Sequence, residues 1–282
     1  MTTPAEPTRT LLCHPAEAAV VTGQQATCRL CGSFWDLESC AKSTTYNPAY
    51  PIRHLHFDER VGRMKVMTLQ NWLTSVELDP RDHVICEVGF GGGFCLAYLR
   101  GLAQETFGIE AIPENLAHAA SLGVPASNLF LFHERPRRLP RPVSLWLFQD
   151  SFEHVPDPDT FLPWVVDNST PAATLLIVLP DATSWSRRLL GRYWPHKLPE
   201  HLFHWSPTGL VEIYRRFGFR QERRFRPVKR VSTIQAVNHL SLMPVRNRAL
   251  SMLGSVVPAV EMWFNIGEMG FLFRRGPSVR QV

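Results

Sequence analysis

A glycine-rich stretch, "VICEVGFGGGF" at residues 84–94, constrains the fold of this chain more than any other segment. It begins with aliphatic residues typical of a buried strand and continues into four glycines within five positions. Glycine allows a ligand to approach the backbone closely, because it has no β-carbon. The stretch therefore predicts a strand, a turn that is suited to a ligand, and the start of a helix.

From residue 84 onward, short aliphatic runs alternate with helical patterns. Strands are expected at about 83–90, 106–111, 129–133, 144–150, 174–180, 219–225 and 267–275. Helices are expected at about 94–103, 113–123, 158–169 and 206–218. This order predicts a doubly wound α/β fold with a mostly parallel, seven-stranded sheet. In such a fold the ligand lies beyond the carboxyl ends of the strands.

Residues 1–72 differ from this pattern, because they are rich in loops and contain four of the six cysteines. They are predicted to form an N-terminal cap that ends in a helix at about 58–73, which packs on the sheet. Residues 73–282 would form the main domain, with an inserted segment at about 231–265. That insert is rich in apolar residues and is expected to be helical.

The spacing of the glycines narrows the choice of ligand. The pattern is Glu87-x-Gly89-x-Gly91-x-Gly93. A dinucleotide fingerprint requires G-x-G-x-x-G, and this sequence does not match it because Phe94 stands at the position of the last glycine. The predicted second strand ends at Glu110, where a carboxylate can accept hydrogen bonds from both ribose hydroxyls of an adenosine. The loop and the acid together favour an adenosine ligand other than a dinucleotide.

Two later segments complete a family pattern: "FQDSFEHVPDP" at 148–158 and "LPEHLFHWSPTGLVEIYRRFGF" at 198–219. With the glycine loop, they resemble the class I S-adenosylmethionine-dependent methyltransferases. The resemblance is to the small-molecule branch, which includes ubiquinone-biosynthesis O-methyltransferases, and it extends over about 73–275. It implies an enzyme that transfers a methyl group from S-adenosylmethionine to a small molecule, most often to an oxygen.

The resemblance also implies which residues bind the cofactor. Glu87 and the glycine backbone would surround its methionine part, and Glu110 would bind its ribose. Glu134 would lie beside the adenine, at a position where the family more often has aspartate. The expected cofactor-binding residues are Glu87, Gly89, Gly91, Gly93, Glu110, Glu134, Gln149 and Asp150.

Three histidines are candidates for acid–base catalysis: His154, His201 and His204. Methyl transfer depends mainly on positioning, and a base is required only if the acceptor carries a proton at working pH. Each histidine could instead form a structural hydrogen bond. In the ubiquinone-type enzymes a similar segment is linked to a divalent cation, which would here lie near Asp150, Glu153 and His154.

The N-terminal cysteines suggest a metal site. Cys28-x-x-Cys31-Gly has the spacing of a zinc knuckle. Cys40 together with Cys13, or with His14 in its place, could complete four ligands. A second C-x-x-C pair is missing, so a degenerate knuckle with free thiols is the alternative.

Charge and composition limit the class of acceptor. The net charge is +5, but the basic residues are scattered in short groups, which disfavours a nucleic-acid partner. Residues 181–197 interleave aromatic residues with arginines, as suits a flat or lipophilic acceptor. The apolar stretch at 250–273 contains charged residues and so does not predict a membrane span. It would complete the core or contact a lipophilic substrate or a membrane surface.

The start of the chain is polar and proline-rich, which predicts a cytoplasmic protein without a secretory signal. Two other functions remain open: a non-catalytic cofactor-binding or scaffold protein of the same fold, and an RNA-modifying methyltransferase. The sequence predicts no oligomeric state.

Overall fold

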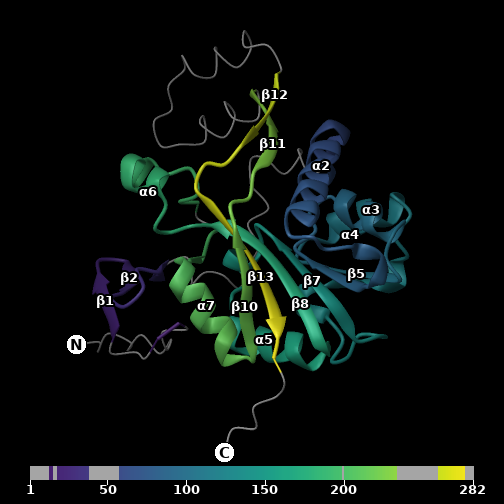
Figure 1. Cartoon of the computed structure of the whole chain (residues 1–282), viewed down its shortest axis with the longest axis horizontal. Helices are drawn as coiled ribbons and strands as arrows, with labels where there is room; N and C mark the ends of the chain where they lie inside the picture. Colours follow the sequence, from purple (N-terminus) through teal and green to yellow (C-terminus); the bar gives the residue numbers. More distant parts are fainter. Residues whose placement is uncertain (1–12, 15–17, 38–56, 199, 234–259, 277–282) are drawn as a thin grey trace, which may run out of the picture.

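The computed structural model describes residues 13–14, 18–37, 57–198, 200–233 and 260–276. Its main layer is a seven-stranded sheet in the order β10-β13-β8-β7-β4-β5-β6 (Figure 1). The strands are β4 (Val84–Val88), β5 (Glu105–Glu110), β6 (Leu129–Leu131), β7 (Val143–Gln149), β8 (Ser169–Pro180), β10 (Phe219–Phe225) and β13 (Glu268–Arg275). β13 is antiparallel to both its neighbours, whereas the other pairs are parallel. The predicted fold class is confirmed.

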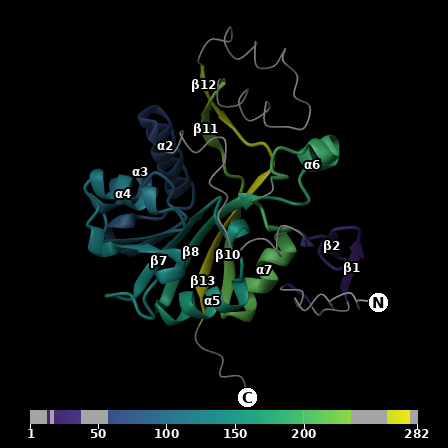
Figure 2. The ribbon, with the colours of Figure 1, turned by 180° about the vertical axis from the view of Figure 1, so that it is seen from behind.

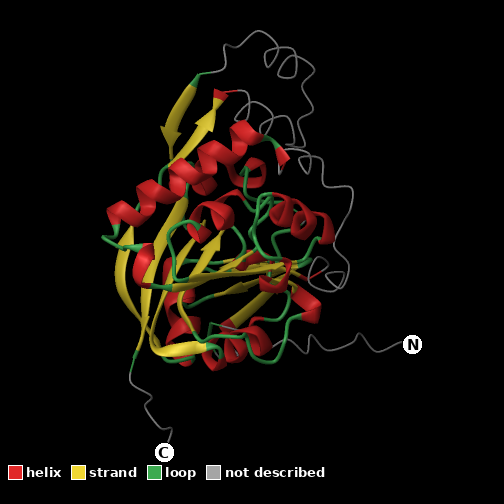
Figure 3. Cartoon of the chain, turned by 90° about the vertical axis from the view of Figure 1, so that its right-hand side faces the viewer, coloured by secondary structure: helices red, strands yellow, loops and turns green. Residues whose placement is uncertain are grey.

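Helices cover both faces of this sheet (Figure 3). The described helices are α2 (Glu59–Ser75), α3 (Phe94–Arg100), α4 (Pro113–Ser121), α5 (Pro158–Asp167), α6 (Trp185–Leu190) and α7 (Pro207–Arg216), of which α6 lies apart from the sheet (Figure 1). Short 3-10 turns cover Pro80–Asp82, Ala126–Asn128, Phe132–Glu134, Phe152–His154 and Gly191–Tyr193. Among the described helices, none is long and apolar enough to cross a membrane.

The alternation of side chains along the central strands explains why helices lie on both faces. In β7, Leu145 and Leu147 pack in one apolar cluster with Leu69 of α2 and Leu99 of α3. The intervening side chain of Trp146 points to the opposite face, into the cluster that contains residues of α5 and α7. Both faces of the strand are therefore buried, which is why its sequence is almost continuously apolar.

The N-terminal segment forms a second, smaller sheet with a distant part of the chain. β1 (Ala19–Thr22), β2 (Gln25–Cys28) and β3 (Phe34–Asp36) are followed by β9 (Phe203–His204) in the order β1-β2-β3-β9. β1 and β2 lie beside α7 in both views of the ribbon (Figures 1 and 2). The sequence indicated a cap, but the pairing with β9 was not predicted.

The expected insert at 231–265 lies largely outside the described residues. Its two described ends form the antiparallel pair β11 (Lys229–Ser232) and β12 (Glu261–Phe264), where the sequence had indicated helix. The aromatic and β-branched residues of these ends suit strands, so the helical expectation is wrong for them. α2 contacts α3 and β11. The domain boundary proposed at residue 72 stays a prediction.

Candidate active site

The glycine-rich loop joins β4 to α3, and its backbone explains the spacing. Gly89, Gly91 and Gly93 have φ of 71°, 57° and 80°, so every second residue adopts the left-handed conformation that favours glycine. A β-carbon on Gly89 would lie 2.5 Å from the β-carbon of Ser151, and one on Gly93 would lie 2.5 Å from that of Ala119. Gly89 therefore lets the loop approach the residues after β7, and Gly93 lets it approach α4.

Glu87 lies in β4 and is only 2% exposed. Its Oε1 accepts a 2.7 Å hydrogen bond from Gln149 Nε2 at the end of β7. Its Oε2 is buried without a hydrogen-bond partner among the described residues. Burial raises the pKa of Glu87 to about 8, although Lys65 and Gln149 act in the opposite direction.

Glu110 ends β5 and binds the loop through its carboxylate. Its Oε2 accepts a hydrogen bond from Gly91 N at 2.8 Å, and its Oε1 accepts one from Ala111 N at 2.7 Å. Burial raises its pKa above the ordinary value, and these backbone donors oppose that shift. Glu87 and Glu110 therefore place two carboxyl groups at the carboxyl ends of neighbouring parallel strands.

Glu134 and Asp150 have different surroundings from those of the two buried acids. Glu134 is exposed in the turn after β6. Asp150 follows β7 with φ of 51°, which is unusual for a residue other than glycine. Both oxygens of Asp150 accept hydrogen bonds from Lys229 Nζ at 2.7 Å. Burial raises the pKa of Asp150, but Lys229 outweighs this effect and the pKa lies below its usual value.

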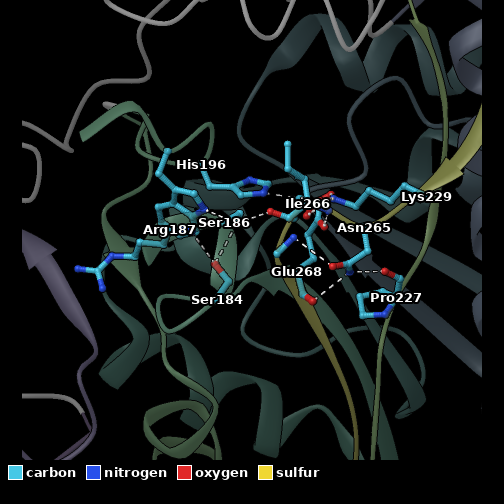
Figure 4. Close-up of polar contacts among 12 residues, drawn as sticks. Ser184, Ser186, Arg187, His196, Pro227, Lys229, Asn265, Ile266 and Glu268 are labelled. Atoms are coloured by element: carbon cyan, nitrogen blue, oxygen red, sulfur yellow. Dashed lines mark hydrogen bonds and ion pairs between the residues drawn. The ribbon is translucent and has the colours of Figure 1, made fainter. Parts of the chain in front are cut away.

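Lys229, at the start of β11, was not identified from the sequence. Its Nζ also lies 3.2 Å from Glu268 Oε1 at the start of β13, and His196 Nε2 lies 3.7 Å from the same oxygen (Figure 4). Burial lowers the pKa of Lys229, but Asp150 and Glu268 raise it by a larger amount. The pKa of Lys229 therefore lies above its ordinary value. Lys229 stands among several other basic residues in the sequence. Its acidic partners belong to distant segments, so no local pattern distinguishes it.

Another buried group lies immediately after β7. Glu153 is 0% exposed, and neither carboxylate oxygen has a hydrogen-bond partner among the other described residues. Glu153, His154 and His201 each offer a ligand atom within 4.8 Å of the others. The ring of His154 is 4.7 Å from that of His201, and its Nδ1 lies 2.7 Å from the carbonyl oxygen of Glu200. The side chains that could hold a cation here are therefore Glu153, His154 and His201. The sequence had suggested Asp150 in place of His201.

The three candidate histidines have lowered pKa values. Burial lowers the pKa of His154, and it lowers that of His201 well below the ordinary value. Burial and then Arg187 lower the pKa of His204 to about 3. His204 stacks on Phe34 of β3, with ring centroids 4.3 Å apart. His154 and His201 thus face Glu153, whereas the ring of His204 packs against the N-terminal sheet.

Three of the four expected metal-binding cysteines lie together in the N-terminal segment. Cys13, Cys28 and Cys31 are free thiols, and His14 joins them in a group whose ligand atoms all lie within 4.8 Å of one another. Cys40 lies outside the described residues.

Comparisons with known proteins show the family of this chain and the solved structures that it resembles. The model of a family described as a methyltransferase domain matches residues 64–223, more than half of the chain. No curated protein sequence matches the chain.

Several solved structures share the fold. BH2331 of Bacillus halodurans, a candidate methyltransferase, has a TM-score of 0.53 and 12% identity, over 74% of this chain and 98% of that one. An S-adenosylmethionine-dependent methyltransferase of Aquifex aeolicus has a TM-score of 0.50 and 16% identity, over 82% of this chain and 100% of that one. The plantazolicin methyltransferase BamL, solved with a desmethyl substrate analogue and SAH, has a TM-score of 0.51 and 14% identity, over 84% and 97%.

The glycine loop, the acids near the carboxyl ends of β4 and β5 and the strand order fit this family. The low identities to the solved structures support the fold alone. That fold is the fold of the solved S-adenosylmethionine-dependent methyltransferases. By the match of the family model, the chain therefore belongs to the methyltransferase domain family.

Proposed function

We propose that this enzyme transfers the methyl group of S-adenosylmethionine to an oxygen of a small, largely apolar acceptor. The observation that carries the proposal is the group of Glu153, His154 and His201 at the carboxyl edge of the sheet, in which Glu153 and His201 are buried. An alcohol or phenol is protonated at neutral pH and must lose this proton when its oxygen is methylated, so a nearby base would assist the reaction. Neutral histidines beside the acceptor edge support an oxygen acceptor.

The residues of this edge suit the cofactor. The free Oε2 of Glu87 and the carboxylate of Glu110 would favour the positive charge and hydroxyl groups of S-adenosylmethionine. When bound, the cofactor supplies a methyl group on a sulfonium. Gln149 would keep the Glu87 carboxyl group in place, and Glu110 would bind the ribose.

His201 is the proposed base. Its Nδ1 is buried and has no hydrogen-bond partner among the described residues, so it can accept a proton from an acceptor hydroxyl. The low pKa keeps the imidazole neutral before the reaction. Glu153 would stabilise the imidazolium after proton transfer, since a negative charge nearby favours the charged ring.

The same three side chains could bind a divalent cation. One carboxylate and two imidazoles are a frequent ligand set for transition metals, and the ligand atoms lie within 4.8 Å of one another. His154 is oriented by its contact with the Glu200 carbonyl, as metal-ligating histidines commonly are. A cation would lower the pKa of a coordinated acceptor hydroxyl, so it would replace His201 as the activating group.

Exposed apolar side chains near the same edge support a lipophilic acceptor. Trp185 and Leu189 of α6 are 53% and 75% exposed, and Trp263 of β12 is 40% exposed. α6 and the β11–β12 pair extend beyond the carboxyl end of β8 (Figure 1). The proposal therefore includes acceptors of the ubiquinone type. It also includes contact of these apolar side chains with a membrane surface.

The decisive experiment measures transfer of a labelled methyl group to a panel of phenols, alcohols, thiols and amines. The expected result is transfer to hydroxyl acceptors, with a loss of at least about a hundredfold in kcat for His201→Asn. His133→Asn, which changes an exposed histidine, is the matched control. Calorimetry with S-adenosylhomocysteine on each variant separates loss of chemistry from loss of cofactor binding.

Each outcome distinguishes one alternative. Cofactor binding without transfer to any acceptor would favour a non-catalytic protein of this fold, and transfer confined to RNA would favour an RNA-modifying enzyme. Chelator treatment that abolishes transfer, with recovery on adding Mg²⁺ or Mn²⁺, would favour the cation over the base. Full hydroxyl activity in His201→Asn without any metal dependence would contradict both roles of the cluster.

A further inference from the structure

Four side chains that are able to bind a metal lie close together in the N-terminal segment. Cys13 Sγ lies 3.6 Å from Cys31 Sγ, and Cys28 Sγ lies 3.4 Å from His14 Nδ1. Cys13 and Cys28 are 1% and 0% exposed. Three sulfur atoms and one imidazole nitrogen form a ligand set that selects zinc in structural sites.

The local backbone brings Cys28 and Cys31 to the same point. Gly32 N donates to Cys28 O at 2.8 Å, and Cys28 N donates to Ser33 O at 2.8 Å, which closes a tight turn. Gly32 has φ of 76°, a conformation that glycine adopts without strain. The Sγ atoms of both cysteines therefore lie within 4.8 Å of each other.

The same turn is joined to the start of α7. Ser33 Oγ lies 3.2 Å from Cys31 Sγ and 3.0 Å from Ser206 Oγ, and it accepts a hydrogen bond from Ser206 N at 2.9 Å. Ser206 is the N-cap of α7, and its Oγ accepts from Gly209 N at 3.0 Å. A β-carbon on Gly209 would lie 3.0 Å from Cys31 Sγ, so this helix start and the cysteine turn approach each other closely.

Strand pairing provides a second connection to the acceptor edge. β3 pairs with β9, with Phe34 opposite His204 and Trp35 opposite Phe203. On the other side, Leu202 N donates to Glu153 O at 3.0 Å. Residues 202–206 therefore connect the cysteine turn to the segment that contains Glu153, and His201 immediately precedes them.

We propose that Cys13, His14, Cys28 and Cys31 bind one Zn²⁺, and that this site fixes β9 and the start of α7 in position. The site is remote from the reacting atoms, so its residues are positioning residues. Because Cys31 and Ser33 contact the start of α7 and β3 pairs with β9, loss of the metal would loosen both. The proposal does not depend on which acceptor the enzyme uses.

The first test measures zinc in the purified full-length chain by mass spectrometry. The expected result is about one zinc per chain, which is retained in Cys95→Ser and Cys40→Ser and lost in Cys28→Ser. Replacing zinc with Co²⁺ should give the intense thiolate charge-transfer absorption of a tetrahedral site. A zinc-free chain that shows no such band after Co²⁺ addition would overturn the metal assignment. Loss of zinc in Cys40→Ser, with retention in His14→Asn, would overturn the ligand set.

The second test follows hydrogen exchange in the wild-type chain before and after zinc removal, so that it does not depend on the folding of a variant. Residues 202–209 should exchange at least about tenfold faster without zinc, whereas α5 should be unchanged. Equal exchange of residues 202–209 in the two forms, with zinc removal verified, would overturn the positioning role. General acceleration that includes α5 would also overturn it, because the metal would then stabilise the whole fold.

Discussion

At the scale of single residues, the two acids beside the glycine loop are buried, but their partners differ. Glu110 accepts backbone hydrogen bonds with both oxygens, whereas Glu87 has one oxygen without a partner among the described residues. An unpartnered buried carboxyl group favours the protonated form. Glu87 therefore destabilises the fold when it ionises, and Glu110 contributes to the structure of the loop.

Replacing Glu87 by glutamine should change how stability depends on pH. Folding raises the pKa of Glu87 from 4.5 to about 8, so the native state keeps a proton that the unfolded state loses. The contribution of protonated Glu87 to the unfolding free energy is fully present below pH 4.5, and it is lost as the pH rises to about 8. Relative to Glu87→Gln, the wild type should lose roughly 4 kcal/mol of unfolding free energy between about pH 5 and pH 9. Urea denaturation across this range measures the difference.

The exposed Glu134→Gln provides the control, since its pH profile should parallel the wild-type profile. If Glu87→Gln also parallels the wild type, the side chain is ionised in the folded protein, and its place in the structure must be different.

Replacing Glu110 should separate cofactor binding from loop stability. Glu110→Gln keeps an oxygen acceptor, whereas Glu110→Ala leaves the N–H groups of Gly91 and Ala111 without this partner. Both variants should weaken S-adenosylhomocysteine binding by at least about tenfold in calorimetry. The alanine variant should also lose about 1–3 kcal/mol of stability. Glu105→Gln, at the start of the same strand, is the control, and unchanged affinity in Glu110→Ala would show that another residue binds the ribose.

At the scale of elements, one ion-pair group joins three strands at the carboxyl edge. Lys229 of β11 contacts Asp150 after β7 and Glu268 of β13. The Glu268 side chain is only 4% exposed, and its Oε1 lies 3.2 Å from Lys229 Nζ. Lys229→Met should lower the unfolding free energy by about 3–5 kcal/mol, because a buried carboxylate would remain without its cation. Urea denaturation measures this loss.

Adding Glu268→Gln to Lys229→Met should recover at least about half of that loss, since the isolated charge is removed. Lys197→Met, which changes an exposed lysine, should be neutral. A loss below about 1 kcal/mol in Lys229→Met, or no recovery in the double variant, would show that the group contributes little to holding these strands together.

The elements that sequence could predict are those with strong periodicity. The buried strands β4, β7 and β8 and the loop between β4 and α3 lie where their patterns indicated. The short strands β1 and β9 lack such a pattern, because their pairing depends on a partner far along the chain. For the same reason, the sequence indicated the local pair Glu153 and His154 but left His201 as a separate candidate. Lys229 was missed, because a basic run does not show which lysine becomes buried.

At the scale of the whole molecule, the distribution of charge matters more than its total. The net charge is +5, yet many described arginines are paired with acids on the surface. Examples are Arg223 with Glu77, Arg274 with Glu222, and Arg215 with Glu212. Such pairs cancel the local potential that a nucleic acid would require, and salt screens the remainder. This arrangement favours a small acceptor over RNA.

Binding of single-stranded RNA should accordingly be weak and should depend little on salt. A plot of the logarithm of the binding constant against that of the salt concentration should have a slope shallower than about −1.5, as expected for contact with few phosphates. Fluorescence anisotropy with a labelled oligonucleotide measures it. A triple variant, Glu77→Gln, Glu212→Gln and Glu222→Gln, frees the paired arginines and should bind more tightly with a steeper slope. A wild-type slope steeper than about −4 would instead indicate a built RNA surface, and the acceptor would have to be sought among nucleic acids.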